Sequence, residues 1–193
     1  MRKIIILIVL ALLITSCDKK ANQVLKELPK ALDTPETTYQ QISESQKITE
    51  KLAKTTPLTE TELQNAFPKK INDLDVDDKI TVIGQQIIGS FGKHKITLSV
   101  MDAAGINSEL GGYFIDSYTY NKEEETDNHK IIHKERNGIK TITNYYVYKG
   151  GCEINFLYEN RYYIMLGNND NEIKMNPDEL WNAFDINALK KFK

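Results

Sequence analysis

The chain has 193 residues, with 25 Lys and Arg against 27 Asp and Glu, and a formal net charge of -2. That length fits one domain with appendages, because globular domains run to about 100–200 residues. The balanced charge argues against a nucleic-acid partner, which is recognised by a concentrated basic surface. Two cysteines are too few for a disulfide scaffold or a four-thiolate zinc site, and we expect no cofactor and no metal centre.

The first predicted element is a signal segment. Arg2 and Lys3 give a positive start, and Ile4–Ile14 is an uninterrupted apolar run of eleven residues. A helix that spans a bilayer needs about 20 apolar residues, so this run has the length of a secretory signal. We predict that residues 1–16 are a signal peptide.

A short motif, Ile14-Thr15-Ser16-Cys17, follows the apolar run and places small side chains before the cysteine. It resembles the lipobox of bacterial lipoprotein precursors. The resemblance implies cleavage before Cys17 and acyl chains, such as palmitate, on its thiol and amino terminus. Since one acyl chain binds a membrane only marginally and two bind stably, we expect a lipid-anchored protein. An ordinary secretory signal that happens to contain a cysteine is the alternative.

The residue after the cysteine, Asp18, bears on which membrane holds the anchor. In the best-known lipoprotein sorting scheme an aspartate there favours the inner membrane, but other bacterial lineages do not follow that rule. We expect the bacterial cell envelope, slightly favour the outer membrane, and leave the leaflet open.

Residues 17–57 are predicted to be a polar, partly helical tether that carries the lipid. The tether begins with apolar residues at helical spacing, Ala21, Val24, Leu25 and Leu28. Pro29 ends this predicted helix, because proline lacks the amide proton that a helix needs. The predicted tether ends where a single globular domain begins, at residue 58.

The globular domain is predicted to open with a helix and two strands. Thr59 and Glu62 have the spacing of a capping box, and Pro68 ends that helix. Lys79–Ile88 is rich in Ile and Val, which indicates a strand, and Gly89–Gly92 is predicted as the turn after it. The next strand alternates apolar and polar residues and begins at His94.

The second half is predicted as a helix, four strands and a last helix. Ala103–Asn121 has helical spacing that glycines at 111 and 112 weaken. Asn137-Gly138 is a strong hairpin signal between the strands His129–Arg136 and Ile139–Lys149, and Cys152–Glu159 and Arg161–Leu166 follow. The final helix is marked by Asn176, Pro177 and Glu179.

The predicted element order is α-β-β-α-β-β-β-β-α. Runs of strands with helices between them indicate the α+β class. We therefore expect an antiparallel sheet of about six strands with helices packed on one face.

Several residues are candidates for metal binding or catalysis, and each has a simpler structural explanation. The acidic run Asp73–Asp78 lacks the glycine and glutamate of an EF-hand loop, and we interpret it as a solvated turn. His129 and His133 lie four apart on a predicted strand, about 13 Å from each other, which is too far for one zinc ion. Cys152 shares an apolar strand face, which indicates a buried thiol, and Asp102 is expected to cap the turn after its strand.

The serine at position 90 lies in Ile88-Gly89-Ser90-Phe91-Gly92, which lacks the first glycine of a nucleophile elbow. No phosphate loop or dinucleotide fingerprint occurs in the sequence. The enzyme question therefore stays open, and the sequence favours a protein without catalytic activity.

Tyrosines crowd three consecutive predicted strands. Such side chains offer a large contact area at low entropic cost, although tyrosine also suits strand interiors. The candidate binding face comprises Tyr145, Tyr146, Tyr148, Tyr158, Tyr162 and Tyr163.

From these observations the sequence predicts a membrane-anchored envelope lipoprotein that acts as a non-catalytic binding or assembly module. Its expected partners are the membrane, through acyl chains on Cys17, and an envelope protein or glycan. Two alternatives stay open: a hydrolase of envelope polymers whose site assembles only on folding, and a carrier of a small ligand or metal that uses the acidic run.

Overall fold

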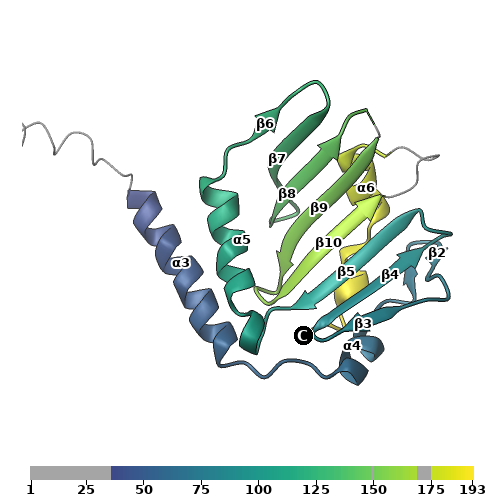
Figure 1. The fold of residues 1–193 in the computed structure, drawn as a ribbon, viewed down its shortest axis with the longest axis horizontal. Helices are drawn as coiled ribbons and strands as arrows, with labels where there is room; N and C mark the ends of the chain where they lie inside the picture. Colours follow the sequence, from purple (N-terminus) through teal and green to yellow (C-terminus); the bar gives the residue numbers. More distant parts are fainter. Residues whose placement is uncertain (1–35, 149, 169–174) are drawn as a thin grey trace, which may run out of the picture. The chain divides into compact units, whose positions relative to one another are not determined.

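The computed structural model describes residues 36–148, 150–168 and 175–193. The chain divides into two compact units, Met1–Gln40 and Gln41–Lys193. All the described strands belong to the second unit, where eight of them form an antiparallel sheet and two form a separate ribbon (Figure 1). The predicted signal peptide, Cys17 and the first part of the predicted tether lie outside the described residues.

The described helices and strands have the following bounds. The helices are α3 (Glu36–Ala53), α4 (Glu60–Ala66), α5 (Glu109–Tyr120) and α6 (Pro177–Ala183), with short 3-10 turns η2 (Gly105–Asn107) and η3 (Ile186–Leu189). The ribbon consists of β1 (Lys70–Ile71) and β2 (Leu74–Asp75). The sheet contains β3 (Thr81–Ile83), β4 (Gln86–Phe91), β5 (Ile96–Asp102), β6 (Glu124–Glu125), β7 (His129–Arg136), β8 (Ile139–Tyr146), β9 (Gly151–Tyr158) and β10 (Tyr162–Asn168).

The strand order across the sheet is β3-β4-β5-β10-β9-β8-β7-β6. This confirms the predicted α+β class, the antiparallel sheet and the four-strand meander from β7 to β10. The hairpin between β7 and β8 forms where predicted, with Asn137 at φ 51° and Gly138 at φ 79°. Both values lie in the left-handed region, as a two-residue type I′ turn requires.

The sheet has eight strands rather than about six because the apolar run Lys79–Ile88 folds back on itself and because Glu124–Glu125 adds the edge strand β6. Gly84, at φ 57°, allows a turn between β3 and β4. The predicted turn Gly89–Gly92 is displaced, since Gly89 lies inside β4. A Cβ atom on Gly89 would come within 2.7 Å of the Phe67 ring, so this glycine allows close packing rather than a turn.

The turn between β4 and β5 contains His94, which was predicted to open a strand. His94 has φ 67° and is exposed, and β5 begins only at Ile96. The Asp77 carboxylate holds this turn by accepting hydrogen bonds from the backbone N–H groups of Lys93 at 2.9 Å and His94 at 2.8 Å. A side chain from the predicted acidic run therefore fixes the backbone here.

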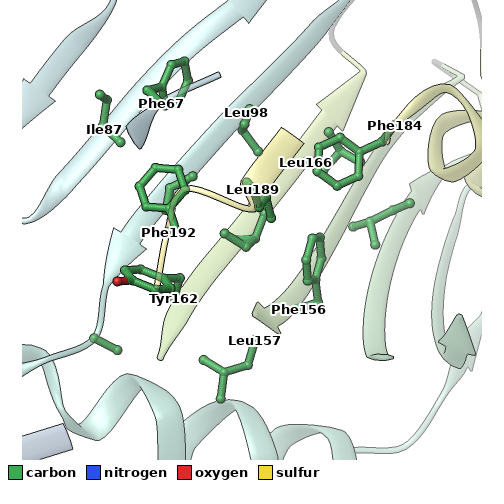
Figure 2. Packing of buried hydrophobic residues seen from close by; sticks show 14 of the residues in the cluster. Phe67, Ile87, Leu98, Phe156, Leu157, Tyr162, Leu166, Phe184, Leu189 and Phe192 are labelled. Atoms are coloured by element: carbon green, nitrogen blue, oxygen red, sulfur yellow. The ribbon is translucent and has the colours of Figure 1, made fainter. Parts of the chain in front are cut away.

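One face of the sheet packs against α6, η3 and the C-terminal residues. The Phe156 and Trp181 rings meet edge to face with centroids 5.4 Å apart. The Tyr162 ring lies 5.3 Å from the Phe192 ring, and its hydroxyl donates a hydrogen bond to the Lys193 carbonyl. Figure 2 shows Tyr162 and Phe192 packed together beside Leu189.

The opposite face of the sheet packs against α5, which corrects the prediction that helices cover one face. Successive strand residues point to opposite sides, yet Phe156 and Leu157 are both buried. Leu157 is directed toward α5 (Figure 2), and the Phe114 ring of α5 lies 6.1 Å from the ring of Tyr163. Two consecutive buried apolar residues therefore mark a strand that is covered on both sides.

Helix α3 packs against α5 through the two glycines that were predicted to weaken that helix. A Cβ atom on Gly111 would come within 2.6 Å of Leu52 Cδ1, and one on Gly112 would collide with Thr49 Oγ1. Ile48 and Leu52 of α3 belong to the hydrophobic core. The compact unit therefore begins earlier than the predicted boundary at residue 58.

The linker between α3 and α4 is attached to one end of the sheet by Asp102. This buried carboxylate accepts hydrogen bonds from the backbone N–H groups of Leu58 and Ala104 and from the Arg161 side chain. The contact with Ala104 is the predicted capping of the turn after β5. Asp102 therefore has a structural role at this position.

Candidate functional site

A cavity of about 510 Å³ lies between α5 and the sheet face that this helix covers. Its volume falls within the range of about 300–1,000 Å³ that is typical of small-ligand sites. Helix α5 contributes Tyr113, Phe114, Ser117 and Tyr120. The strands contribute Ile131, His133, Ile142, Asn144, Asn155 and Tyr163. We call this space the α5 cavity.

Sheet register brings the strand residues of the α5 cavity together. His133 lies opposite Ile142, and Ile142 lies opposite Asn155, so three neighbouring strands present one row of side chains on the same face. The next strand, β10, adds Tyr163, which is directly opposite Leu157. The side chains of α5 form the other wall of the cavity, which is open to solvent.

The imidazole of His133 has its hydrogen-bonding pattern determined by α5. Its Nδ1 lies 3.0 Å from the Tyr118 carbonyl oxygen, and its ring stacks on the Tyr118 ring at 5.3 Å. A carbonyl oxygen can only accept a hydrogen bond, so Nδ1 carries the proton. In the neutral ring, Nε2 is then an acceptor, and this buried atom has no partner among the described residues.

The side chain of Asn155 is also oriented by a neighbour. Its Nδ2 group donates a hydrogen bond to Glu153 Oε1 at 2.9 Å, and the reverse amide orientation would place two acceptors against each other. Asn155 is 6% exposed. Its Oδ1 atom is buried and has no hydrogen-bond partner within the described part of the chain.

The hydroxyl of Tyr163 supplies a hydrogen-bond donor, in contrast to the acceptors on His133 and Asn155. Burial raises the pKa of Tyr163 to about 12, and the nearby Glu153 carboxylate acts in the same direction. The phenol therefore keeps its proton at physiological pH and can donate a hydrogen bond. Among the other lining residues are Lys122 and Glu124, which carry opposite charges.

This arrangement is suited to binding rather than to nucleophilic chemistry. The one cysteine of the described chain, Cys152, is buried and faces the opposite side of the sheet, in register with Tyr145. Burial raises the pKa of its thiol to about 12, so the thiolate that reacts as a nucleophile is scarce at neutral pH. Ser90 lies inside β4 and not on the strand-to-helix turn of a nucleophile elbow.

The six predicted tyrosines do not form one exposed face. Tyr162 is fully buried, and three others are partly buried against the core: Tyr145, Tyr158 and Tyr163. Tyr146 is 48% exposed and Tyr148 is 82% exposed. Only Tyr163 of the six lines the α5 cavity, and two tyrosines outside the predicted set join it there, Tyr113 and Tyr120.

The two histidines considered as metal ligands, His129 and His133, have different neighbours. His129 and His133 point to the same face of β7, where each ring stacks on a different tyrosine, Tyr146 and Tyr118 respectively. Across residues 36–148, 150–168 and 175–193, no three His, Cys, Asp or Glu side chains are grouped so that they could hold a metal ion.

Two central residues of the cavity, Asn155 and Phe114, were not identified from the sequence. Asn155 interrupts an otherwise apolar segment, Ile154–Leu157. A polar side chain between buried neighbours is the signal that could have indicated a hydrogen-bonding site on the second face of the sheet. Phe114 could be placed only once α5 was known to cover that face.

Comparison with models of known protein families, with curated proteins and with solved structures found no match to this chain. The helices within the described residues are all too short or too polar to cross a membrane. The α5 cavity is therefore interpreted from its own geometry and chemistry.

Proposed function

We propose that this protein is a lipid-anchored lipoprotein of the bacterial envelope and that it acts as a non-catalytic binding module, with the α5 cavity as its ligand site. The observation that carries the binding role is a cavity of ligand size, two of whose lining residues carry buried hydrogen-bonding atoms that have no partner. The lipobox-like motif Ile14-Thr15-Ser16-Cys17 supports the anchor.

The energetic argument for a ligand rests on the unpaired atoms. A buried polar atom without a hydrogen bond costs about 1–3 kcal/mol, and folded proteins leave few such atoms. His133 and Asn155 each carry one, and both line the same cavity. A bound molecule that pairs with them would recover this cost and gain binding free energy from it.

The anchor is tested by metabolic labelling with palmitate in a bacterial host. The wild-type protein should incorporate label and sediment with membranes, whereas Cys17→Ser should do neither. Cys152→Ser is the matched control, because it removes the only other thiol and should leave both results unchanged. Labelling of the Cys17→Ser protein would contradict the proposed anchor.

The ligand site is tested with a variant that fills the cavity. Purified full-length protein is equilibrated with the small-molecule fraction of an envelope digest, and retained compounds are identified by mass spectrometry. Asn144→Trp places a large ring in the cavity and should abolish retention. Ser90→Trp adds the same ring to a partly exposed position on the same sheet face, outside the cavity, and should retain the ligand.

Two results of this experiment would contradict the binding role. One is that the wild-type protein retains no compound from the envelope digest. The other is that wild type and Asn144→Trp retain the same compounds in equal amounts, because the ligand would then bind elsewhere on the protein.

A further inference from the structure

We propose that the α5 cavity is specific for an uncharged, hydroxyl-rich ring, as found in a saccharide, and that its hydroxyl groups donate hydrogen bonds to His133 Nε2 and Asn155 Oδ1. This inference rests on the proposed function, because it names the ligand class of the same site. Its basis is the hydrogen-bonding polarity of the two unpaired atoms.

Both unpaired atoms are acceptors, for independent reasons. His133 must protonate Nδ1 to donate to the Tyr118 carbonyl, and Asn155 must direct its amide N–H toward Glu153. What remains on Asn155, and on His133 in its neutral form, is a lone pair. A ligand that satisfies both must bring at least two donors, which excludes ligands that carry only acceptors.

The charges and rings around these acceptors narrow the class further. Lys122 and Glu124 at the rim have opposite charges, and the Glu153 carboxylate lies beside Asn155, so an anionic ligand is disfavoured. A quaternary ammonium cation has no N–H group to donate to the two acceptors. The Phe114 and Tyr163 rings meet at an interplanar angle of 67° and offer apolar surface next to the polar wall. A sugar ring matches this combination, since it has hydroxyl donors at its edge and apolar C–H groups on its faces.

The ligand must displace some side chains as it binds. Nε2 of His133 and Oδ1 of Asn155 are covered from solvent in the unliganded structure. Changes of side-chain rotamer at a binding surface are common even where the backbone stays fixed. The backbone around the cavity is held by the paired strands β7, β8, β9 and β10, so the adjustment falls to the side chains that line it.

The test uses full-length protein in a detergent that contains no sugar and no choline group. Four probes are titrated: N-acetylglucosamine, its β-1,4-linked dimer, choline as a cation, and acetate as an anion. Binding is followed by isothermal titration and by the NMR signals of the Asn155 side-chain amide and the His133 imidazole. One of the two saccharides should bind and shift both signals, and choline and acetate should not.

Three variants connect the binding to the acceptors. His133→Phe keeps an aromatic ring on Tyr118, Asn155→Leu keeps the side-chain size, and each should weaken saccharide binding by about tenfold or more. His129→Phe is the matched control, since His129 also stacks on a tyrosine and has an unpaired Nε2 but lies outside the cavity. Its affinity should equal that of the wild type.

Thermal unfolding without ligand shows whether the acceptors serve structure or binding. His133→Phe and Asn155→Leu each remove an unpaired buried acceptor but also remove a hydrogen bond, to the Tyr118 carbonyl and to Glu153 respectively, so each melting temperature should fall only slightly and unfolding should stay cooperative. The inference is overturned if neither saccharide binds, if choline or acetate binds instead, or if His129→Phe weakens binding as much as His133→Phe does. An envelope compound of another class whose retention Asn144→Trp abolishes would overturn this inference and leave the proposed function standing.

Discussion

Arg161 donates two parallel hydrogen bonds to Asp102, from Nε to Oδ1 at 2.8 Å and from Nη2 to Oδ2 at 2.7 Å. Asp102 is fully buried, and its remaining lone pairs accept backbone N–H groups. The hydrogen bonds to Asp102 raise the pKa of the Arg161 guanidinium above its usual value. The pair joins adjacent strands, β5 and β10, to the linker that precedes α4.

Replacing Arg161 with Met should destabilise the protein by about 3–5 kcal/mol, because it leaves a buried carboxylate without its counter-charge. Urea unfolding measures the loss. Lys70→Met is the control: it removes an exposed ion pair with Asp75, 3.4 Å long, and exposed pairs contribute about 0–1 kcal/mol. Equal effects from the two substitutions would contradict the role assigned to Asp102.

Replacing Gly112 with Ala should also destabilise the protein, although alanine is the better helix former by about 1 kcal/mol. The added methyl group would collide with Thr49 of α3, and overpacking of this kind costs about 1–3 kcal/mol. Combining it with Thr49→Ala should restore part of the loss in a double-mutant cycle followed by urea unfolding. Stabilisation by Gly112→Ala alone would show that the helices are not in close contact.

The ion pairs of Asp178 predict a pH dependence of stability. Hydrogen bonds from Lys134, with a smaller contribution from Arg136, lower the pKa of Asp178 below 3.8. A carboxylate whose pKa is lower in the folded than in the unfolded state stabilises the fold at pH values above its unfolded-state pKa. This stabilisation is lost as the pH falls through the folded-state pKa.

Asp178→Asn should therefore cost no more than about 1 kcal/mol at pH 7, because the carboxylate is exposed to solvent. The melting temperatures of wild type and variant should converge as the pH is lowered from 5 toward about 2. Calorimetry at a series of pH values measures both. A difference that stays constant down to the lowest pH would contradict the ion-pair explanation.

The buried thiol of Cys152 should be unreactive while the protein is folded. Because burial raises its pKa to about 12, the thiolate is scarce at pH 8. In the Cys17→Ser background, alkylation by iodoacetamide should be about 100-fold slower or more in buffer than in urea. Equal rates in buffer and urea would show that Cys152 is exposed.

Local sequence signals predicted those parts of the fold that depend on neighbouring residues. The capping box of Thr59 with Glu62 and the turn at Asn137-Gly138 form as predicted. Asn176 caps the last helix as predicted, and the structure adds a capping box with Glu179. Each depends on contacts within a few residues, so the surrounding fold does little to change it.

The parts that could not be predicted depend on contacts between distant segments. Helix propensity alone predicts that Gly111 and Gly112 weaken α5. It carries no information about α3, which packs against both glycines. The α5 cavity is similar: Asn155 and His133 lie on different strands, and only the sheet register and the position of α5 bring them to one wall. The six tyrosines were grouped because they lie on three consecutive predicted strands, and strand alternation divides them between two faces of the sheet.

The burial of Phe192 has a practical consequence for handling the protein. Its ring fills space beside Tyr162, and the Lys193 carbonyl accepts a hydrogen bond from the Tyr162 hydroxyl. An affinity tag fused directly after Lys193 would begin at the edge of the hydrophobic core, so it needs a flexible spacer. The exposed turn at Asn137-Gly138 is the better place to insert a label.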